Sequence, residues 1–481
     1  MKKYIFTILA AVAVLSSCGK DFLTEEPHLA QSDILTLSTF EGLDNSTAGA
    51  YAPLASTNWY GAHFILDFEM GTGNAKRWGV IFDDYESGRY TDEYAINYTA
   101  NNTSPLWATA YYVILSANSV LAHVDDAGIE ATDQQKNNLK AECLFLRALA
   151  HFDLVRVYAQ PYNYTADHSH YGVPYVKIVD SEAKPARDKV GDVYKYIIED
   201  LTEAEKIIDP KYVRSGVKDA TASVSLEAIQ ALLARVYLYT SDYQNAADYA
   251  TKVINSGKFK LWTVEDLEDG AVYGEDVPGK DSEVIFEVYL NTSQSYGTGN
   301  ENVWGMTSYN AYGDCGVSND LYELYDDDDV RKTLIAPDED GNALFTLKYF
   351  GKGLGDLDAA NVILLRLSEM YLTRAEAVTV GGATGYNASD DLAALAASRG
   401  TSPAQTSNEG IFEERRKELA WEGHYWFDLA RTGRKMTRTD ISGTVPKELA
   451  YPHNYWAKPI PAREFTVNPN LKPQNEGYSE Q

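Results

Sequence analysis

The chain contains few cysteines and few basic residues for its length. Only 3 of its 481 residues are cysteine, which is too few for a disulfide framework. It holds 42 Lys and Arg against 70 Asp and Glu, giving a formal net charge of -28. This surplus of acid argues against a broad basic face, so we expect binding neither to nucleic acid nor to an anionic membrane surface.

Motifs for metal binding and catalysis are also missing. The 8 histidines include no HExxH or HxxxH pair, which makes a zinc site improbable. The acidic run at 326–329 lacks the spaced ligands and glycine of an EF-hand, so we interpret it as a solvated turn. No GxSxG elbow occurs, and GKGLGD at 351–356 does not match a phosphate-binding loop. The sequence therefore predicts no metal, no cofactor and no catalytic residue.

Long apolar runs are absent beyond the N-terminus, which reads MKKYIFTILAAVAVLSSC. Lys2 and Lys3 precede an apolar stretch that is shorter than the roughly 20 residues a membrane-spanning helix needs. This layout predicts a signal peptide over 1–17. The final four residues resemble a bacterial lipobox, so Cys18 is expected to be lipidated, followed by a tether to residue 27 and one domain over 28–481. The alternative is an ordinary cysteine after an ordinary cleavage site.

Helical periodicity is abundant. With 44% hydrophobic residues, the chain can bury a substantial core. In 136–159 apolar residues recur every three or four positions, which predicts a helix of about six turns ending before Pro161. The same pattern predicts helices over 193–208, 361–378 and 409–422, and two more within 225–257. We therefore expect a mostly α-helical fold.

The two helices within 225–257 are predicted to meet at Ser241 and Asp242. Small and aromatic residues in them fall at positions resembling a tetratricopeptide repeat, where small side chains let paired helices approach closely: Ala234, Tyr237, Tyr243, Ala246, Ala250 and Val253. Several such pairs predict a tetratricopeptide-like scaffold. Scaffolds of this kind usually mediate binding.

One highly charged stretch, EERRKELAWEGHYWFDLARTGRK, occupies 413–435. Its spacing predicts a helix that Gly423 closes. His424 is interpreted as a packing residue. Charges at helical spacing that become buried need partners, so the stretch predicts a structural ion-pair network involving Glu414, Arg415 and Glu418.

Two regions, 58–105 and 257–360, show short alternating runs and many polar residues, which predicts long loops and short strands. Both contain clusters of aromatic and polar residues in a chain with 35 Tyr and 8 Trp. A flat ring stacks on the apolar face of a sugar while Asn, Asp and Arg reach its hydroxyls, so the clusters indicate a glycan site. The alternative is that these rings anchor their own loops to the core.

From the lipobox to the last residues, the sequence resembles the SusD/RagB-like outer-membrane lipoproteins of Bacteroidetes. The resemblance rests on ordered segments that include AECLFLRALAHFDLVRVYAQPY, ILLRLSEMYLTRAEA, IFEERRKELAWEGHYWFDLARTG and KPIPAREFTVNPNLKPQNEGY. It implies a surface protein, anchored in the outer membrane by its lipid alone, that is not an enzyme. Such proteins capture glycans, or sometimes peptides, and cap a SusC-like TonB-dependent transporter.

The resemblance places the ligand site in the aromatic loops. We therefore expect the following glycan-binding residues: Trp59, Arg77, Trp78, Asp84, Tyr296, Trp304 and Tyr312. Three alternatives stay open. The protein could be a surface glycoside hydrolase, since a pair of carboxylates can always be found among 70 acids. It could instead bind peptide, or act as a purely structural subunit of the transporter.

Overall fold

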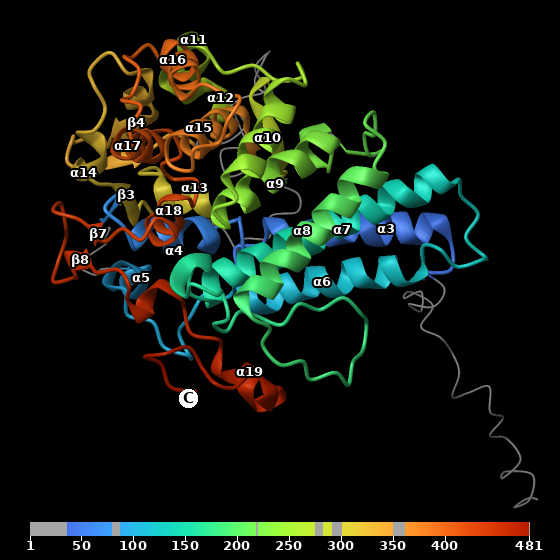
Figure 1. Ribbon diagram of the computed structural model, residues 1–481. Helices are drawn as coiled ribbons and strands as arrows, with labels where there is room; N and C mark the ends of the chain where they lie inside the picture. The colour runs from blue at the N-terminus through green and yellow to red at the C-terminus, as the bar shows by residue number, and fades with distance from the viewer. Residues whose placement is uncertain are drawn as a thin grey trace, which may run out of the picture.

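The computed structural model describes residues 36–78, 87–217, 220–274, 282–290, 301–349 and 361–480. The predicted signal peptide, the tether and the lipidation of Cys18 lie outside these ranges. The described chain is mostly helical with a few short strands, which confirms the predicted fold class (Figure 1). None of its helices is long and apolar enough to cross a membrane.

Helices from the first half of the chain pack around one long central helix (Figure 1). They are α3 (Phe40–Tyr51), α6 (Leu106–His123), α7 (Asp133–Tyr158) and α8 (Val190–Ile207). The central helix α7 begins at a capping box, in which the Thr132 side chain accepts a hydrogen bond from the Gln135 backbone N–H. Every side chain over 141–158 is buried, because α3, α6 and α8 all pack against α7.

A second group of helices comes from later in the chain: α9 (Leu226–Tyr239), α10 (Tyr243–Ile254), α15 (Leu367–Thr379), α16 (Ala388–Arg399), α17 (Asn408–Glu418) and α18 (Tyr425–Arg431). α9 and α10 are the predicted helix pair, and Asp242 caps α10 by accepting from the Asn245 backbone N–H. α10 also packs against α15, which in turn packs against α16 and α17. The tetratricopeptide-like character of these pairs stays a prediction.

Within the described ranges the strands are short and form three small sheets: β1 (Ala75–Arg77), β3 (Cys315–Val317), β5 (Leu344–Thr346) and β4 (Ile335–Pro337) in that order, β2 (Val284–Val288) with β6 (Val362–Arg366), and β7 (Met436–Thr437) with β8 (Glu448–Leu449). All pairings are antiparallel. The first sheet joins the two regions that the sequence predicts to be irregular.

Three local predictions are wrong. Residues 362–366 form a strand and not the start of a helix, since a short apolar run buried on both faces fits either element. The region 58–105 contains a helix, α4 (His63–Met70), of which seven residues are buried. Gly423, at φ 74°, lies in the connection to α18, because α17 already ends at Glu418.

The predicted ion-pair network is confirmed, with partners from several other elements. The buried Glu418 carboxylate accepts from Arg399 at 2.7 Å, from Arg331 at 2.9 Å and from Arg366. Arg415 pairs with Asp428 at 3.3 Å and with Glu376 at 3.4 Å. The acidic turn at 326–329 is only partly solvated, because Asp329 is buried against Arg331. The charged stretch thus ties α17 to the rest of the core.

Candidate functional site

The pairing of β1 with β3 brings the two aromatic clusters together. Arg77 lies opposite Cys315, and the Trp78 backbone N–H donates to the Asp314 carbonyl at 3.0 Å. The half-buried Trp78 ring lies on Gly316, where a Cβ would come within 2.0 Å of the indole. Glycine is therefore needed at 316 for the ring to occupy this place.

The Tyr312 ring is covered by the side chain of Arg89. The Arg89 guanidinium lies 3.9 Å from the ring centre of Tyr312, a cation–π contact. Its nitrogens also lie 3.5 Å from the Asp314 carboxylate and 3.6 Å from that of Glu301. Because the Arg77 side chain donates to the Arg89 carbonyl at 3.0 Å, the strand end and the Tyr312 loop are joined through Arg89.

The loop after α13 (Val303–Thr307) carries the exposed part of this surface. Tyr309 is 39% exposed, and its ring packs against Phe345 at 6.1 Å. Tyr312 is half-buried and lies three residues further on. We call this surface the aromatic loop site; its members are Arg77, Trp78, Arg89, Tyr309 and Tyr312.

Two predicted ligand residues are buried in the core. Trp59 is fully buried, and its indole N–H donates to the Asp153 carboxylate at 2.7 Å. Trp304 is 9% exposed, and the helix that carries it is held to the Trp59 turn by a hydrogen bond from the Val303 N–H to the Gly61 carbonyl at 2.7 Å. Because neither ring offers a face to the surface, we leave both out of the proposed site.

Asp84 and Tyr296 lie outside the described residues. Of the predicted site residues, the structure therefore brings together Arg77, Trp78 and Tyr312. The site prediction omitted Arg89 and Tyr309. Both stand within the aromatic clusters, but a lone arginine or tyrosine in a polar loop carries no spacing signal that would single it out.

The buried carboxyl of Glu69 holds the residue that precedes β1. Glu69 accepts hydrogen bonds from the Asn74 side chain at 3.0 Å and from the Gly423 N–H at 3.2 Å. Asn74 in turn accepts from the Arg416 guanidinium at 2.8 Å. Burial raises the pKa of Glu69 to about 7, against the lowering effect of the bond from Asn74. The charged stretch and β1 are thus connected through this carboxyl.

Glu69 gives a testable pH dependence. Its folded-state pKa of about 7 lies above the ordinary value of 4.5, so its contribution to stability is fully present below about pH 4.5 and is lost as the pH rises through 7. Relative to Glu69→Gln, which stays neutral, we expect the wild type to lose up to about 3 kcal/mol of unfolding free energy between pH 4.5 and 8. Urea denaturation of both proteins across this range measures it, and parallel curves would refute it.

In the described ranges, no group of three or more His, Cys, Asp or Glu side chains is placed to hold a metal ion. The two cysteines in those ranges, Cys143 and Cys315, are buried and unpaired, and burial raises the pKa of both thiols. The chemistry of the aromatic loop site is therefore that of flat rings beside charged hydrogen-bonding groups.

Two family profiles match the chain. The profile described as SusD-like_3, "Starch-binding associating with outer membrane", matches residues 21–238, and the profile described as the SusD family (SusD_RagB) matches 345–478. The chain belongs to the SusD/RagB-like family. Among curated relatives of this SusD-like protein, SusD-like protein P2 of Formosa agariphila is 26% identical over 99% of this chain and 100% of its own.

Solved structures agree with the family. A putative sugar binding protein from Bacteroides vulgatus is 28% identical, covers 92% of the SusD-like chain and 99% of its own, and superposes with a TM-score of 0.82. A SusD superfamily protein from Bacteroides thetaiotaomicron is 26% identical, with coverages of 91% and 99% and a TM-score of 0.80. Surface glycan-binding protein A from Bacteroides fluxus, at 22% identity and a TM-score of 0.74, shares the fold, with coverages of 91% and 99%.

Proposed function

We propose that this SusD-like protein binds a glycan at the cell surface through its aromatic loop site. The observation that carries the proposal is a group of three rings beside the paired strands β1 and β3: Trp78 on Gly316, Tyr312 under Arg89, and the exposed Tyr309 of the same loop as Tyr312. Rings of this kind stack on the apolar faces of sugars. The family profile described as starch-binding and a solved relative described as a putative sugar binding protein support the same ligand class.

The polar groups at the site suit sugar hydroxyls. Arg89 has both of its carboxylate contacts at 3.5 Å or more, so its guanidinium can turn toward a ligand oxygen without breaking a short ion pair. Asp314 also accepts from the Ser87 hydroxyl at 2.6 Å, which holds the carboxylate in place. Stacking a few sugar units on these rings is favourable, but ordering a flexible glycan costs entropy. The net binding free energy is therefore roughly 4 to 8 kcal/mol, which corresponds to millimolar to micromolar affinity.

We also propose a cellular role for the protein, which rests on its membership of the SusD/RagB-like family. Residues 28–481 form a single domain, tethered through a lipid on Cys18 to the outer membrane and facing the cell exterior. The bound oligo- or polysaccharide passes to a SusC-like TonB-dependent transporter that the protein caps. The proposal contains no catalytic step. Co-purification of a TonB-dependent receptor with the tagged full-length protein from its own membrane tests the partnership.

Removing the rings tests the site. We expect Trp78→Ala and Tyr312→Ala each to weaken glycan binding roughly five- to tenfold, because each change removes one stacking platform worth about 1 kcal/mol. A glycan array identifies the ligand, and affinity electrophoresis with titration calorimetry measures the change. Tyr112→Ala is the matched control, since Tyr112 is 58% exposed on the remote helix α6.

The alternatives give different results. If both ring variants bound glycan as tightly as the Tyr112→Ala control, the aromatic loop site would be the wrong place. Release of reducing sugar that a single Asp or Glu substitution abolishes would show a glycoside hydrolase. Unchanged uptake of glycan by cells that carry a binding-dead, correctly folded protein would favour a purely structural subunit.

A further inference from the structure

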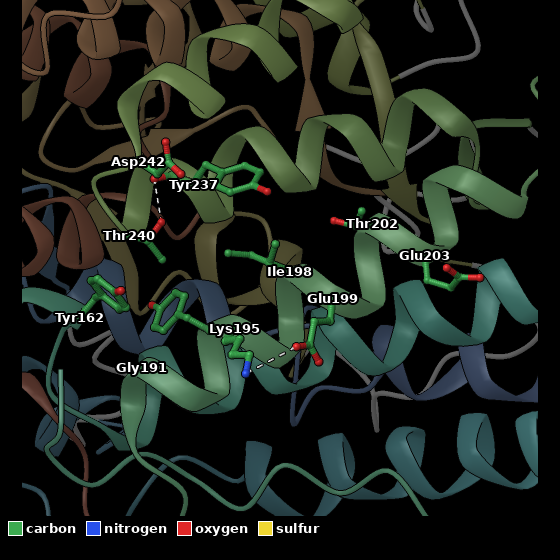
Figure 2. Close-up of a pocket in the computed structure, with 11 residues that line it drawn as sticks. Tyr162, Gly191, Lys195, Ile198, Glu199, Thr202, Glu203, Tyr237, Thr240 and Asp242 are labelled. Atoms are coloured by element: carbon green, nitrogen blue, oxygen red, sulfur yellow. Dashed lines mark hydrogen bonds and ion pairs between the residues drawn. The ribbon is translucent and has the colours of Figure 1, made fainter. Parts of the chain in front are cut away.

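A separate cavity lies among the helices. It has a volume of about 540 Å³ and lies between Tyr162, helix α8 and the end of α9 (Figure 2). Figure 2 shows the lining side chains of Tyr162, Ile198 on α8 and Tyr237, together with Thr202, Thr240 and Asp242. We call it the α8–α9 cavity. It shares no residue with the aromatic loop site, and its volume suits a small ligand.

Tyr194 lines this cavity with a hydroxyl that lacks a partner. The residue is 3% exposed, and its ring packs edge-on against Phe152 and Tyr162, with ring centres 6.1 and 5.2 Å away. Within the described part of the chain, no residue forms a hydrogen bond with this hydroxyl. The oxygen is not among the buried polar atoms that lack a partner, so it is open to the cavity, where a ligand oxygen can accept its hydrogen bond.

Two further tyrosines are held in fixed orientations. Tyr162 stacks on His168 with ring centres 3.8 Å apart, and Tyr237 stacks on Tyr249 at 5.5 Å. Both rings border the cavity and are only partly buried. Rings that are already supported on one side lose little freedom when a ligand packs against them.

Two of the three acids around the cavity pair with lysines. Glu199 pairs with Lys177 at 3.3 Å and with Lys195 at 3.9 Å, while Glu203 pairs with Lys206 at 3.3 Å. The remaining acid of the wall, Asp242, caps α10. The wall therefore offers hydrogen-bonding groups with little unpaired charge, which favours a neutral polyhydroxyl ligand over an organic cation.

We propose that the α8–α9 cavity is a second carbohydrate-binding site, which takes a short neutral oligosaccharide. Tyrosine rings contact the sugar faces, and the Tyr194 hydroxyl bonds to a sugar hydroxyl. The site is built from residues that the proposed function does not use. A protein with this cavity binds oligosaccharide at two independent places.

The test uses a background in which the aromatic loop site is removed, the Trp78→Ala/Tyr312→Ala protein. Saturation-transfer NMR is recorded with neutral di- to tetrasaccharides of α-1,4-glucose, β-1,4-glucose, β-1,4-xylose and β-1,4-mannose. We expect at least one of them to bind. Adding Ile198→Trp, which fills the cavity, should abolish that binding, and adding Tyr194→Phe should weaken it roughly three- to tenfold by removing one hydrogen bond.

Tyr196→Phe is the matched control, because Tyr196 lies on the same helix but does not border the cavity; melting temperatures verify folding. The inference is overturned if no saccharide binds the background protein, if Ile198→Trp leaves binding intact, or if Tyr194→Phe acts no differently from Tyr196→Phe. Binding of spermidine in place of every saccharide would also overturn it. If Ile198→Trp abolishes binding in the wild type while the ring variants do not, the aromatic loop site fails and this inference stands.

Discussion

Glu418→Gln is expected to lower the free energy of unfolding by about 3 to 5 kcal/mol, the usual cost of removing one partner from a buried ion pair. Glu418 is 3% exposed and is shared by Arg331, Arg366 and Arg399, each of which is also buried. Without the carboxylate, Arg331 and Arg399 keep one or two acidic partners each but face a neutral amide. Urea or guanidinium denaturation at neutral pH measures the loss.

The stabilisation by Glu418 is also expected to depend on pH. Burial alone would raise the pKa of Glu418, but Arg399, Arg366 and Arg331 hold it well below its usual value. Since the folded pKa is depressed, the carboxylate stabilises the fold above the unfolded pKa, and this advantage over Glu418→Gln is lost as the pH falls through the folded pKa. The exposed Glu413→Gln on the same helix should change stability by less than about 0.5 kcal/mol. Equal effects of the two substitutions would contradict the network.

The long helices could be predicted because their evidence is local. The apolar stripe over 136–159 repeats at the helical period, and α7 occupies Asp133–Tyr158. Where an apolar run is short, long-range packing decides whether it forms a helix or a strand. Residues 362–366 become a strand because β2 pairs with them, although β2 lies more than seventy residues earlier in the chain. The helix end expected at Gly423 failed because α17 ends at Glu418 and the backbone turns before that glycine is reached.

The site was only partly predictable because aromatic residues in polar loops look alike in sequence. Trp59 and Trp78 both stand in the first cluster, yet Trp59 is buried against Asp153, which is 94 positions away, while Trp78 follows strand β1 and is only half-buried. The antiparallel register that sets Arg77 opposite Cys315 is a long-range property. No local spacing encodes which loop tyrosine meets Arg89, so that contact becomes visible only in the fold.

Asp153→Asn should also be strongly destabilising, by about 3 kcal/mol, because it removes the counter-charge of a buried arginine. Asp153 is fully buried and forms an ion pair with Arg156, while it accepts from the Trp59 indole at 2.7 Å and from the Tyr60 hydroxyl at 2.5 Å. The Arg156 guanidinium lies between aromatic rings, 4.2 Å from the centre of Phe152. These rings attract the cation but do not replace a carboxylate.

A double-mutant cycle separates charge from packing at this pair. The amide introduced by Asp153→Asn can still accept hydrogen bonds from Trp59 and Tyr60, so most of the loss should come from the uncompensated charge of Arg156. Asp153→Asn/Arg156→Met removes that charge, and we expect it to cost clearly less than the sum of the two single substitutions. Guanidinium denaturation of the four proteins gives the coupling energy. Additive losses would mean that the two side chains act independently.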